Sequence, residues 1–309
     1  MLFMIVLAVL WIKSSRPLAI HFVSHAFLPN LTNFNNLAFL TTIIFGLMGL
    51  EMSAVHAGDV RNPQKDYPRA LFWSTSLILI TLILSSLAIS FIVPAKQLSI
   101  LSGLTEAYVV FFNSFHLPFF IPIIISLIII GSLCSISTWV IGPTRGLLIA
   151  TFENKISGLH CLLKVNRFGA PVCLLLFQGI LVTLLSSLFI LIPSVSEAYW
   201  LLSVMTAQLA VLFYIFLFLA ALRLRYKEAR QSRVYRIPGG KWGIWIVTGL
   251  GLLACVMTFI LGFFPPAVIV VDNLVKFDMI LLGGLLLFCL PAVLSGVLLI
   301  GRSDSENNN

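Results

Sequence analysis

Seven long apolar runs dominate the sequence and restrict what it can fold into. They lie at residues 37–57, 71–93, 120–150, 172–192, 198–222, 243–265 and 277–301. Each reaches the roughly 20 residues that a helix needs to cross the hydrocarbon core of a bilayer. None alternates apolar and polar residues over about ten positions, as the strands of a membrane β-barrel do. The runs therefore predict seven full transmembrane helices.

The composition supports a membrane protein. Hydrophobic residues make up 60% of the 309 residues and charged residues only 10%, whereas a soluble domain carries about 25% charged residues. Such a chain cannot cover a water-exposed surface. A net charge of +8 could suggest nucleic-acid binding in a soluble protein, but here the basic residues lie in short loops between the runs. We predict an all-α integral membrane protein, with residues 1–309 in a single membrane domain and no nucleic-acid partner.

The loop charges predict an orientation. Most of the 19 lysines and arginines lie in loops 58–70, 151–171 and 223–242. Positively charged loops stay on the cytoplasmic side of a membrane, so these three loops are predicted to be cytoplasmic. The most basic of them, 223–242, is also expected to touch anionic lipid.

The two ends of the chain differ from the apolar runs. Residues 1–12 are apolar but too short to cross a bilayer alone. Lys13 and Arg16 follow this stretch, whereas a signal peptide carries its basic residues before the apolar part. We expect residues 1–12 to be a partial helix, the second half of one whose first half is missing. Residues 302–309 are expected to form a disordered tail.

No pattern for catalysis or metal binding occurs in the sequence. The five cysteines stand singly, without a CxxC pair. His21 and His25 are four residues apart, but no third ligand accompanies them. The zinc-protease HExxH, the Gly-x-Ser-x-Gly elbow and the Walker loop are all absent. We therefore predict no enzymatic activity, no cofactor and no metal.

The run 37–57 contains the residues whose burial in a membrane interior costs the most free energy. Gly46 and Gly49 interrupt it, and Glu51 follows at membrane depth, where a carboxylate costs roughly 2.5–3.5 kcal/mol. A glycine-interrupted helix near the midplane is typical of a transporter binding site, because its unwound backbone can face a ligand. The alternative interpretation is that the glycines are close-packing contacts and that Glu51 is a capped, neutral acid.

Two further runs contain candidate site residues. In run 120–150, Trp139 is accompanied by small polar residues, and Gly142-Pro143 follows and should bend or loosen the helix. A proline kink without a ligand is the alternative there. In run 198–222, Tyr214 is a candidate, although a single tyrosine can equally belong to a core or an interfacial belt.

Three motifs, in order along the chain, resemble those of amino acid–polyamine–organocation (APC) transporters. The sixth helix of that family and its following loop resemble GLMGLEMSAVHAGDVRNPQKDYPRA, at residues 46–70. The eighth helix resembles STWVIGPTRG, at residues 137–146, and the loop before the eleventh resembles YRIPGGKWG, at residues 235–243. The chain is most similar to the bacterial glutamate/gamma-aminobutyrate antiporters within this family.

The resemblance implies a LeuT-like fold of twelve helices with two inverted repeats. On this basis residues 1–12 would be part of helix five, and residues 37–222 the second inverted repeat, helices six to ten. Residues 243–301 would be the two extra helices, eleven and twelve. This agrees with the half helix and seven spans expected from the residues themselves.

The resemblance also implies a substrate site. Gly46 to Ser53 would be the unwound segment, Phe45 an aromatic gate, Glu51 an acid tied to gating and Trp139 a residue near the substrate. The complete set of implied substrate-binding residues is Phe45, Gly46, Gly49, Glu51, Ser53, Ser135, Trp139 and Tyr214.

The sequence departs from the antiporter pattern at two positions. The antiporters carry an acid one helical turn before the tryptophan, where this chain has Ser135. They carry a tyrosine one turn before Tyr214, where this chain has Ala210. Both departures affect residues near the substrate, so they put specificity for glutamate in question.

The implied function is secondary active antiport of amino acids, with a glutamate- or GABA-like substrate, across a bacterial inner membrane. The partners would be a small amino acid and the lipid bilayer. One alternative is a truncated, non-functional remnant or one half of a split transporter, with a separate N-terminal half or a second copy as partner. Another is a non-transporting membrane scaffold, which a large soluble domain or a long tail would favour.

Overall fold

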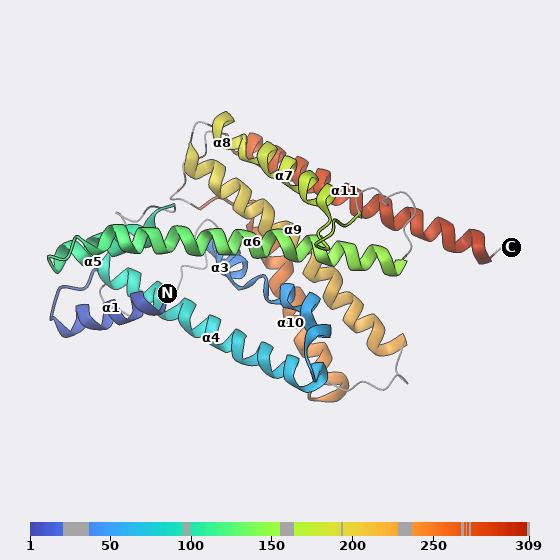
Figure 1. The fold of residues 1–309 in the computed structure, drawn as a ribbon, viewed down its shortest axis with the longest axis horizontal. Coiled ribbons are helices and arrows are strands. Elements are labelled where there is room, and N and C mark those ends of the chain that lie inside the picture. The colour runs from blue at the N-terminus through green and yellow to red at the C-terminus, as the bar shows by residue number, and fades with distance from the viewer. Residues whose placement is uncertain are drawn as a thin grey trace. The chain divides into compact units, whose positions relative to one another are not determined.

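A computed structural model gives the arrangement of most of the chain. It describes residues 1–20, 37–94, 99, 101–154, 164–192, 194–227, 237–266, 269, 271 and 273–307. The helices are α1 (Leu2–Lys13), α3 (Phe39–Leu47), α4 (Pro63–Ile92), α5 (Gly103–Ser114), α6 (Phe120–Asn154), α7 (Val172–Ser186), α8 (Leu188–Leu191), α9 (Val195–Lys227), α10 (Gly240–Leu261) and α11 (Leu274–Asn307), with a 3₁₀ helix η2 (Leu50–Asp59) (Figure 1). Within these ranges the named elements are all helical, which confirms the predicted all-α class.

Six of the predicted spans are confirmed as membrane-length helices among the described residues. They are Pro63–Ile92, Phe120–Leu148, Val172–Leu191, Val195–Lys227, Gly240–Leu261 and Leu274–Val293. The first predicted span, 37–57, is different, because it is divided between the short helices α3 and η2. α5 is an addition: it lies between two spans, where its mixed polarity does not produce a long apolar run.

The described chain divides into two compact units. One contains Met1–Leu28 and Gly49–Leu184, and the other contains Pro29–Met48 and Leu185–Asn309. The chain passes from one to the other between Met48 and Gly49, the point at which α3 has ended and η2 has not begun. Each unit is described separately below.

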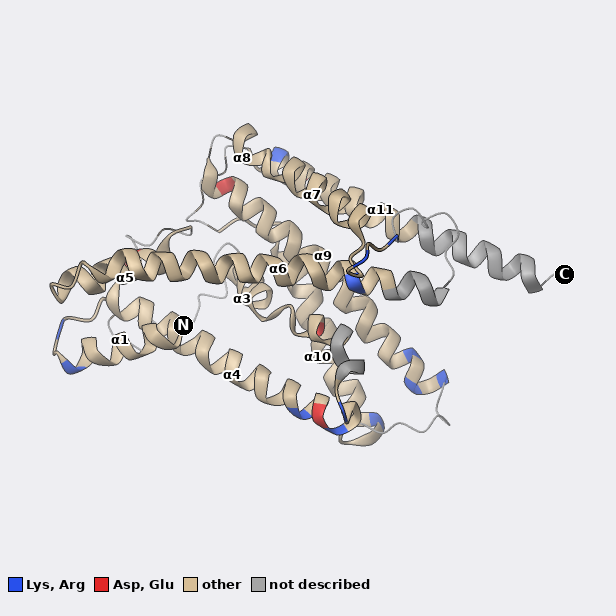
Figure 2. Ribbon diagram, viewed as in Figure 1, with Lys and Arg blue, Asp and Glu red and all other residues tan. Residues whose placement is uncertain are grey.

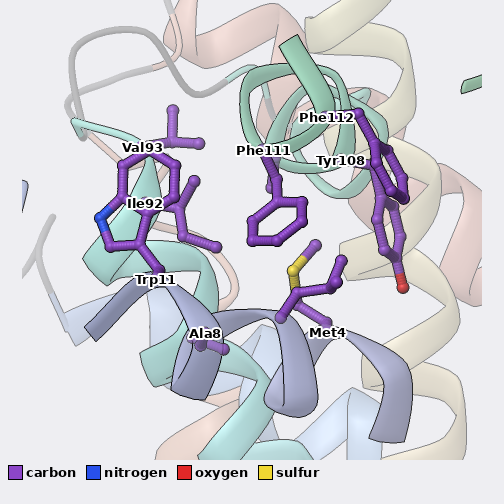
Figure 3. Packing of buried hydrophobic residues seen from close by; sticks show 11 residues of the cluster. Met4, Ala8, Trp11, Ile92, Val93, Tyr108, Phe111 and Phe112 are labelled. Carbon is purple, nitrogen blue, oxygen red and sulfur yellow. The ribbon is translucent and has the colours of Figure 1, made fainter. Parts of the chain in front are cut away.

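The first unit has a core where α1, the end of α4 and α5 meet. α1 buries Met4, Leu7, Ala8 and Trp11, a spacing of three and four residues that places them on one helical face. These side chains belong to one buried cluster with Phe111 and Phe112 of α5, and Figure 3 shows Met4 beside Phe111. The rings of Trp11 and Phe111 lie 6.1 Å apart, and such aromatic pairs add about 0.5–1.5 kcal/mol beyond burial.

Arg16 ties this core to the end of α5. Its guanidinium lies 4.4 Å from the ring of Phe115 and 5.4 Å from that of Trp11. It also donates a hydrogen bond to the carbonyl of Ser114, the last residue of α5, at 2.5 Å. A cation is favourable there because the carbonyl end of a helix is electronegative.

The second unit is organised around α9. α10 runs antiparallel to it, and three contacts follow one another along the pair: Gln208 with Phe259, Phe218 with Gly251, and Tyr226 with Trp245. Gln208 is fully buried and donates from Nε2 to the carbonyl of Phe259 at 2.9 Å. This bond supplies a partner to a carbonyl near the end of α10, which a membrane interior requires.

Small residues on α10 and α11 allow close approach to α9. A Cβ atom at Gly251 would lie 2.4 Å from the ring of Phe218, and one at Gly284 would lie 2.4 Å from the sulfur of Met205. Helices in lipid associate through this kind of close packing, because apolar side chains gain little by leaving an apolar solvent.

Replacing Gly251 by alanine should therefore destabilise the α9–α10 contact. The new methyl group would overlap an aromatic ring, and overpacking of this kind costs about 1–3 kcal/mol. Gly249 is the matched control, since a Cβ there meets nothing within 4 Å. In detergent, thermal unfolding of G251A should occur at a lower temperature, whereas G249A should equal or exceed the parent. Equal melting of the two variants would contradict the packing described.

A second prediction concerns acid stability and the start of α5. Glu106 accepts hydrogen bonds from the Ser102 hydroxyl and from the backbone N–H of Ser99, and these bonds lower its pKa. A lowered pKa contributes stability that is present above the unfolded-state pKa and is lost as the pH falls through the folded-state pKa. Part of the loss of thermal stability between about pH 6 and pH 3 should therefore disappear in E106Q. An unchanged pH profile in E106Q would contradict this role.

Candidate substrate site

The interruption predicted in run 37–57 is present and can now be located. α3 ends at Leu47, Met48 is extended (φ −73°, ψ 157°), and Gly49 has φ +101°. A 3₁₀ helix then begins at Leu50. Of the stretch from Gly46 to Ser53 that was predicted to be unwound, only Met48 and Gly49 lie outside a helix, because α3 includes Gly46 and η2 includes Ser53.

Glu51 provides a hydrogen-bond acceptor for the backbone at the interruption. Its Oε2 accepts the backbone N–H of Gly49 at 3.1 Å, a group that no longer belongs to a continuous helix. The carboxylate thus lies at the start of η2, where the exposed N–H groups of a helix favour a negative charge. This contact supplies the cap of the alternative interpretation, but not the neutral form that it also assumes, and it holds the acid beside the break.

Trp139 of α6 covers the break. A Cβ atom added to Gly49 would lie 3.1 Å from Cζ2 and 3.3 Å from Cη2 of its indole. The ring therefore lies directly against the backbone of Gly49, which a residue with a side chain could not allow. About half of the Trp139 surface, 47%, is still exposed. Ser135 lies one helical turn earlier on α6 and is also exposed.

A second contact between η2 and α6 occurs one turn further along. A Cβ atom at Gly142 would lie 2.4 Å from the terminal methyl carbon of Met52. Gly142 therefore leaves space for the methionine, just as Gly49 leaves space for the tryptophan. Together the two glycines let the 3₁₀ segment lie close to α6.

The Ser53 hydroxyl makes two hydrogen bonds within the protein. Its hydroxyl is 2.7 Å from the carbonyl of Leu50, to which it donates, and 3.0 Å from the hydroxyl of Tyr67 near the start of α4. The first bond lies within η2, and the second connects η2 to α4. The contacts of Tyr67 and Met52 could not be predicted from the sequence, in which Tyr67 is visible only as part of the motif at residues 46–70.

The predicted site residues are divided between the two units. Gly49, Glu51, Ser53, Ser135 and Trp139 belong to the first, where Gly49 contacts both Glu51 and Trp139. The other three, Phe45, Gly46 and Tyr214, belong to the second. Within that unit Phe45 and Gly46 lie in the last turn of α3, and the Tyr214 ring lies 5.6 Å from that of Phe213 on α9.

Metal ligands were not expected from the sequence. Among the residues that the structure describes, no three His, Cys, Asp or Glu side chains are grouped so that they could hold a metal ion. The pair His21 and His25 lies outside those residues.

The close approach of Gly49 to Trp139 leads to a prediction about stability. A φ of +101° is accessible to glycine but strained for any residue with a side chain, and a methyl group would also press on the indole. G49A should lower the free energy of unfolding by about 1–3 kcal/mol, measured as a drop in thermal stability in detergent. Gly131, in the middle of α6 with open space around it, provides the control, and G131A should be close to neutral. A neutral G49A would overturn the assigned backbone conformation.

Comparison with known proteins identifies the family of this chain. The model of the family described as "Amino acid permease" matches residues 1–288. An uncharacterized transporter of Legionella pneumophila is 46% identical over 93% of this chain and 61% of its own length. Two glutamate/gamma-aminobutyrate antiporters, from Lactococcus lactis subsp. lactis and subsp. cremoris, are each 28% identical over 89% of this chain and 55% of their own. The chain thus spans a little more than half the length of these relatives.

The family match extends over all the elements from α1 to the first half of α11. It therefore includes five of the six membrane-length helices completely, most of the sixth, and the interrupted segment with Trp139 against it. The protein belongs to the amino acid permease family of the APC superfamily, and it is a multi-pass membrane protein.

Proposed function

We propose that this chain takes part in secondary transport of amino acids, by exchange, and that substrate binds beside Gly49, just before η2 begins. The observation that carries the proposal is the arrangement around Gly49. A glycine with positive φ, an acid hydrogen-bonded to its N–H and a half-exposed indole occur together within the first unit.

The chemistry of an amino acid suits such a break. Backbone N–H groups at the start of a helix favour a carboxylate, and unwound carbonyl oxygens favour an ammonium group. Both kinds of group are available only where a helix in the membrane is interrupted. On this proposal Gly49 and its neighbours contact the α-amino and α-carboxyl groups, and the exposed face of Trp139 lies against the substrate side chain.

The acid Glu51 is proposed to couple binding to movement of the segment. It holds the N–H of Gly49 in the present conformation, so a substrate group that competes for this N–H would release the carboxylate. Alternating access needs an element with two arrangements whose balance the substrate changes. The segment from Met48 to Ser53 is proposed as that element.

The names of two relatives guide the choice of substrate. They are glutamate/gamma-aminobutyrate antiporters, so glutamate and GABA are the first compounds to assay. Ser135 lies on the same face of α6 as Trp139, four residues earlier, and is exposed. The antiporters carry an acid at this position, so the uncharged serine changes the charge beside the tryptophan. Amino acids with uncharged side chains therefore belong in the same panel.

The test is exchange by the reconstituted chain. Proteoliposomes loaded with one unlabelled amino acid should take up a labelled amino acid from the panel. W139A should reduce this uptake by at least about tenfold, as expected when a contact worth roughly 1.4 kcal/mol or more is lost. W73A is the matched control, since Trp73 on α4 is 71% exposed and remote from the break in sequence, and it should exchange like the parent.

A conservative change at Glu51 separates coupling of binding to movement from contact with the substrate. E51Q keeps the size of the side chain and an acceptor oxygen but removes the charge, so it should lower the maximal rate more than it changes the concentration for half-maximal uptake. Equal exchange in the parent, W139A and E51Q would remove the break from the substrate site. Absence of exchange in the parent, together with no thermal stabilisation by any amino acid in the panel, would contradict transport by this chain.

A further inference from the structure

Basic side chains gather where α9 ends and α10 begins. The last two turns of α9 carry Arg223, Arg225 and Lys227, and the first turn of α10 carries Lys241. Figure 2 shows blue segments at both of these helix ends. Loop 223–242 contains seven Lys or Arg residues and one acid, Glu228, which lies outside the described residues. Positive charge is therefore in clear excess at this end of the helix pair.

A hydrogen bond between two aromatic side chains connects the two helices at the same level. The indole Nε1–H of Trp245 donates to the hydroxyl of Tyr226 at 2.6 Å. Both rings remain about half exposed, 53% for Trp245 and 50% for Tyr226. Their polar edges are thus paired with each other, while their apolar faces are open to the surroundings.

The cations lie on both sides of this aromatic pair. Lys241 precedes Trp245 by four residues, one helical turn, so the two share a face of α10. Arg223 precedes Tyr226 by three residues, and Lys227 follows it directly. All three cations are exposed. We call Arg223, Tyr226, Lys227, Lys241 and Trp245 the basic–aromatic site.

Stabilisation of the helix ends accounts for only part of this pattern. Cations in the last turn of α9 complement the negative end of that helix. Lys241, however, lies at the positive end of α10, where a cation is unfavourable. The first turn of α10 contains no acid, and its N-cap makes no side-chain hydrogen bond. An uncapped helix start beside Lys241 favours an anion from outside the protein.

Exposed side chains on both helices change from charged and aromatic to aliphatic with distance from these helix ends. On α10, Lys241 is followed one turn later by Trp245, and the exposed aliphatic residues Ile246 and Leu250 follow on other faces of the helix. On α9, read from its end inwards, Lys227 and Tyr226 come first, Arg223 lies one turn deeper, and exposed Leu219 lies one turn beyond Arg223. The long side chain of Arg223 can extend back towards the headgroup level. Cations and aromatic rings near the helix ends, with aliphatic residues deeper, correspond to headgroup, interface and acyl chain.

We propose that the basic–aromatic site binds one anionic phospholipid. Its phosphate lies among Arg223, Lys227 and Lys241, and its glycerol and upper acyl chains lie on the open faces of Tyr226 and Trp245. The aromatic rings beside the charges and the exposed aliphatic residues deeper along both helices favour a lipid over free phosphate, which needs only the charges. This site is independent of the proposed substrate site, since its residues are all in the second unit.

The test is native mass spectrometry of the full chain, released from detergent after delipidation. Phosphatidylglycerol should be retained as a single adduct more strongly than phosphatidylcholine. R223Q/K227Q/K241Q should bind phosphatidylglycerol about a hundredfold more weakly, given about a tenfold loss or slightly less for each basic residue near an anionic surface. R61Q/K65Q/R69Q, which removes three charges from another basic loop, should retain the adduct.

Two further variants keep the test decisive if the triple variant folds poorly. R223K/K227R/K241R preserves all charges and should retain the lipid. K241Q alone changes one exposed residue and should weaken retention by up to about tenfold. Equal weakening in the two triple glutamine variants would overturn the proposal in favour of a general charge effect. Displacement of the lipid by millimolar inorganic phosphate would also overturn it, in favour of a plain anion site.

Discussion

A backbone that leaves its helix inside a membrane must find new hydrogen-bond partners, and this requirement governs the segment around Gly49. The chain leaves α3 at Leu47 and resumes as η2 at Leu50. Glu51 accepts the N–H of Gly49, and the N–H of Met52 reaches the carbonyl of Gly49 at 3.2 Å. An unpaired group in hydrocarbon costs several kcal/mol, so the break can persist only with such local partners. The same local partners make it a place where a polar ligand could compete.

Glycine residues determine how closely the helices approach in both units. Gly49 and Gly142 admit Trp139 and Met52 in the first unit, and Gly251 and Gly284 admit Phe218 and Met205 in the second. In each case a large, apolar side chain lies against a bare backbone. Close packing of this kind replaces the hydrophobic driving force that lipid does not provide. Gly49 is therefore a packing residue as well as a conformational one, so the packing contact of one interpretation and the interrupted backbone of the other occur at the same residue.

The helices were predictable because membrane thickness sets a simple rule. A run of about 20 apolar residues must be helical to satisfy its own backbone, and six of seven runs are confirmed on this basis. The remaining run, 37–57, is recognisable as irregular from Gly46, Gly49 and Glu51, but its hydropathy alone indicates a full span. α5 was missed because a helix with Glu106, Asn113 and a buried aromatic face has no long apolar run.

The sequence by itself determined the class, six of the long helices, the position of the break to within a few residues and the family resemblance. These features depend on local composition and spacing, which the order of residues contains directly. Only the tertiary structure decided that Trp139 covers Gly49, that the Ser53 hydroxyl reaches Tyr67, and that Trp245 meets Tyr226 across two helices. Such contacts join residues 14 to 90 positions apart. They depend on how the helices pack, and helix packing follows from the shapes of whole faces and is not contained in any single motif.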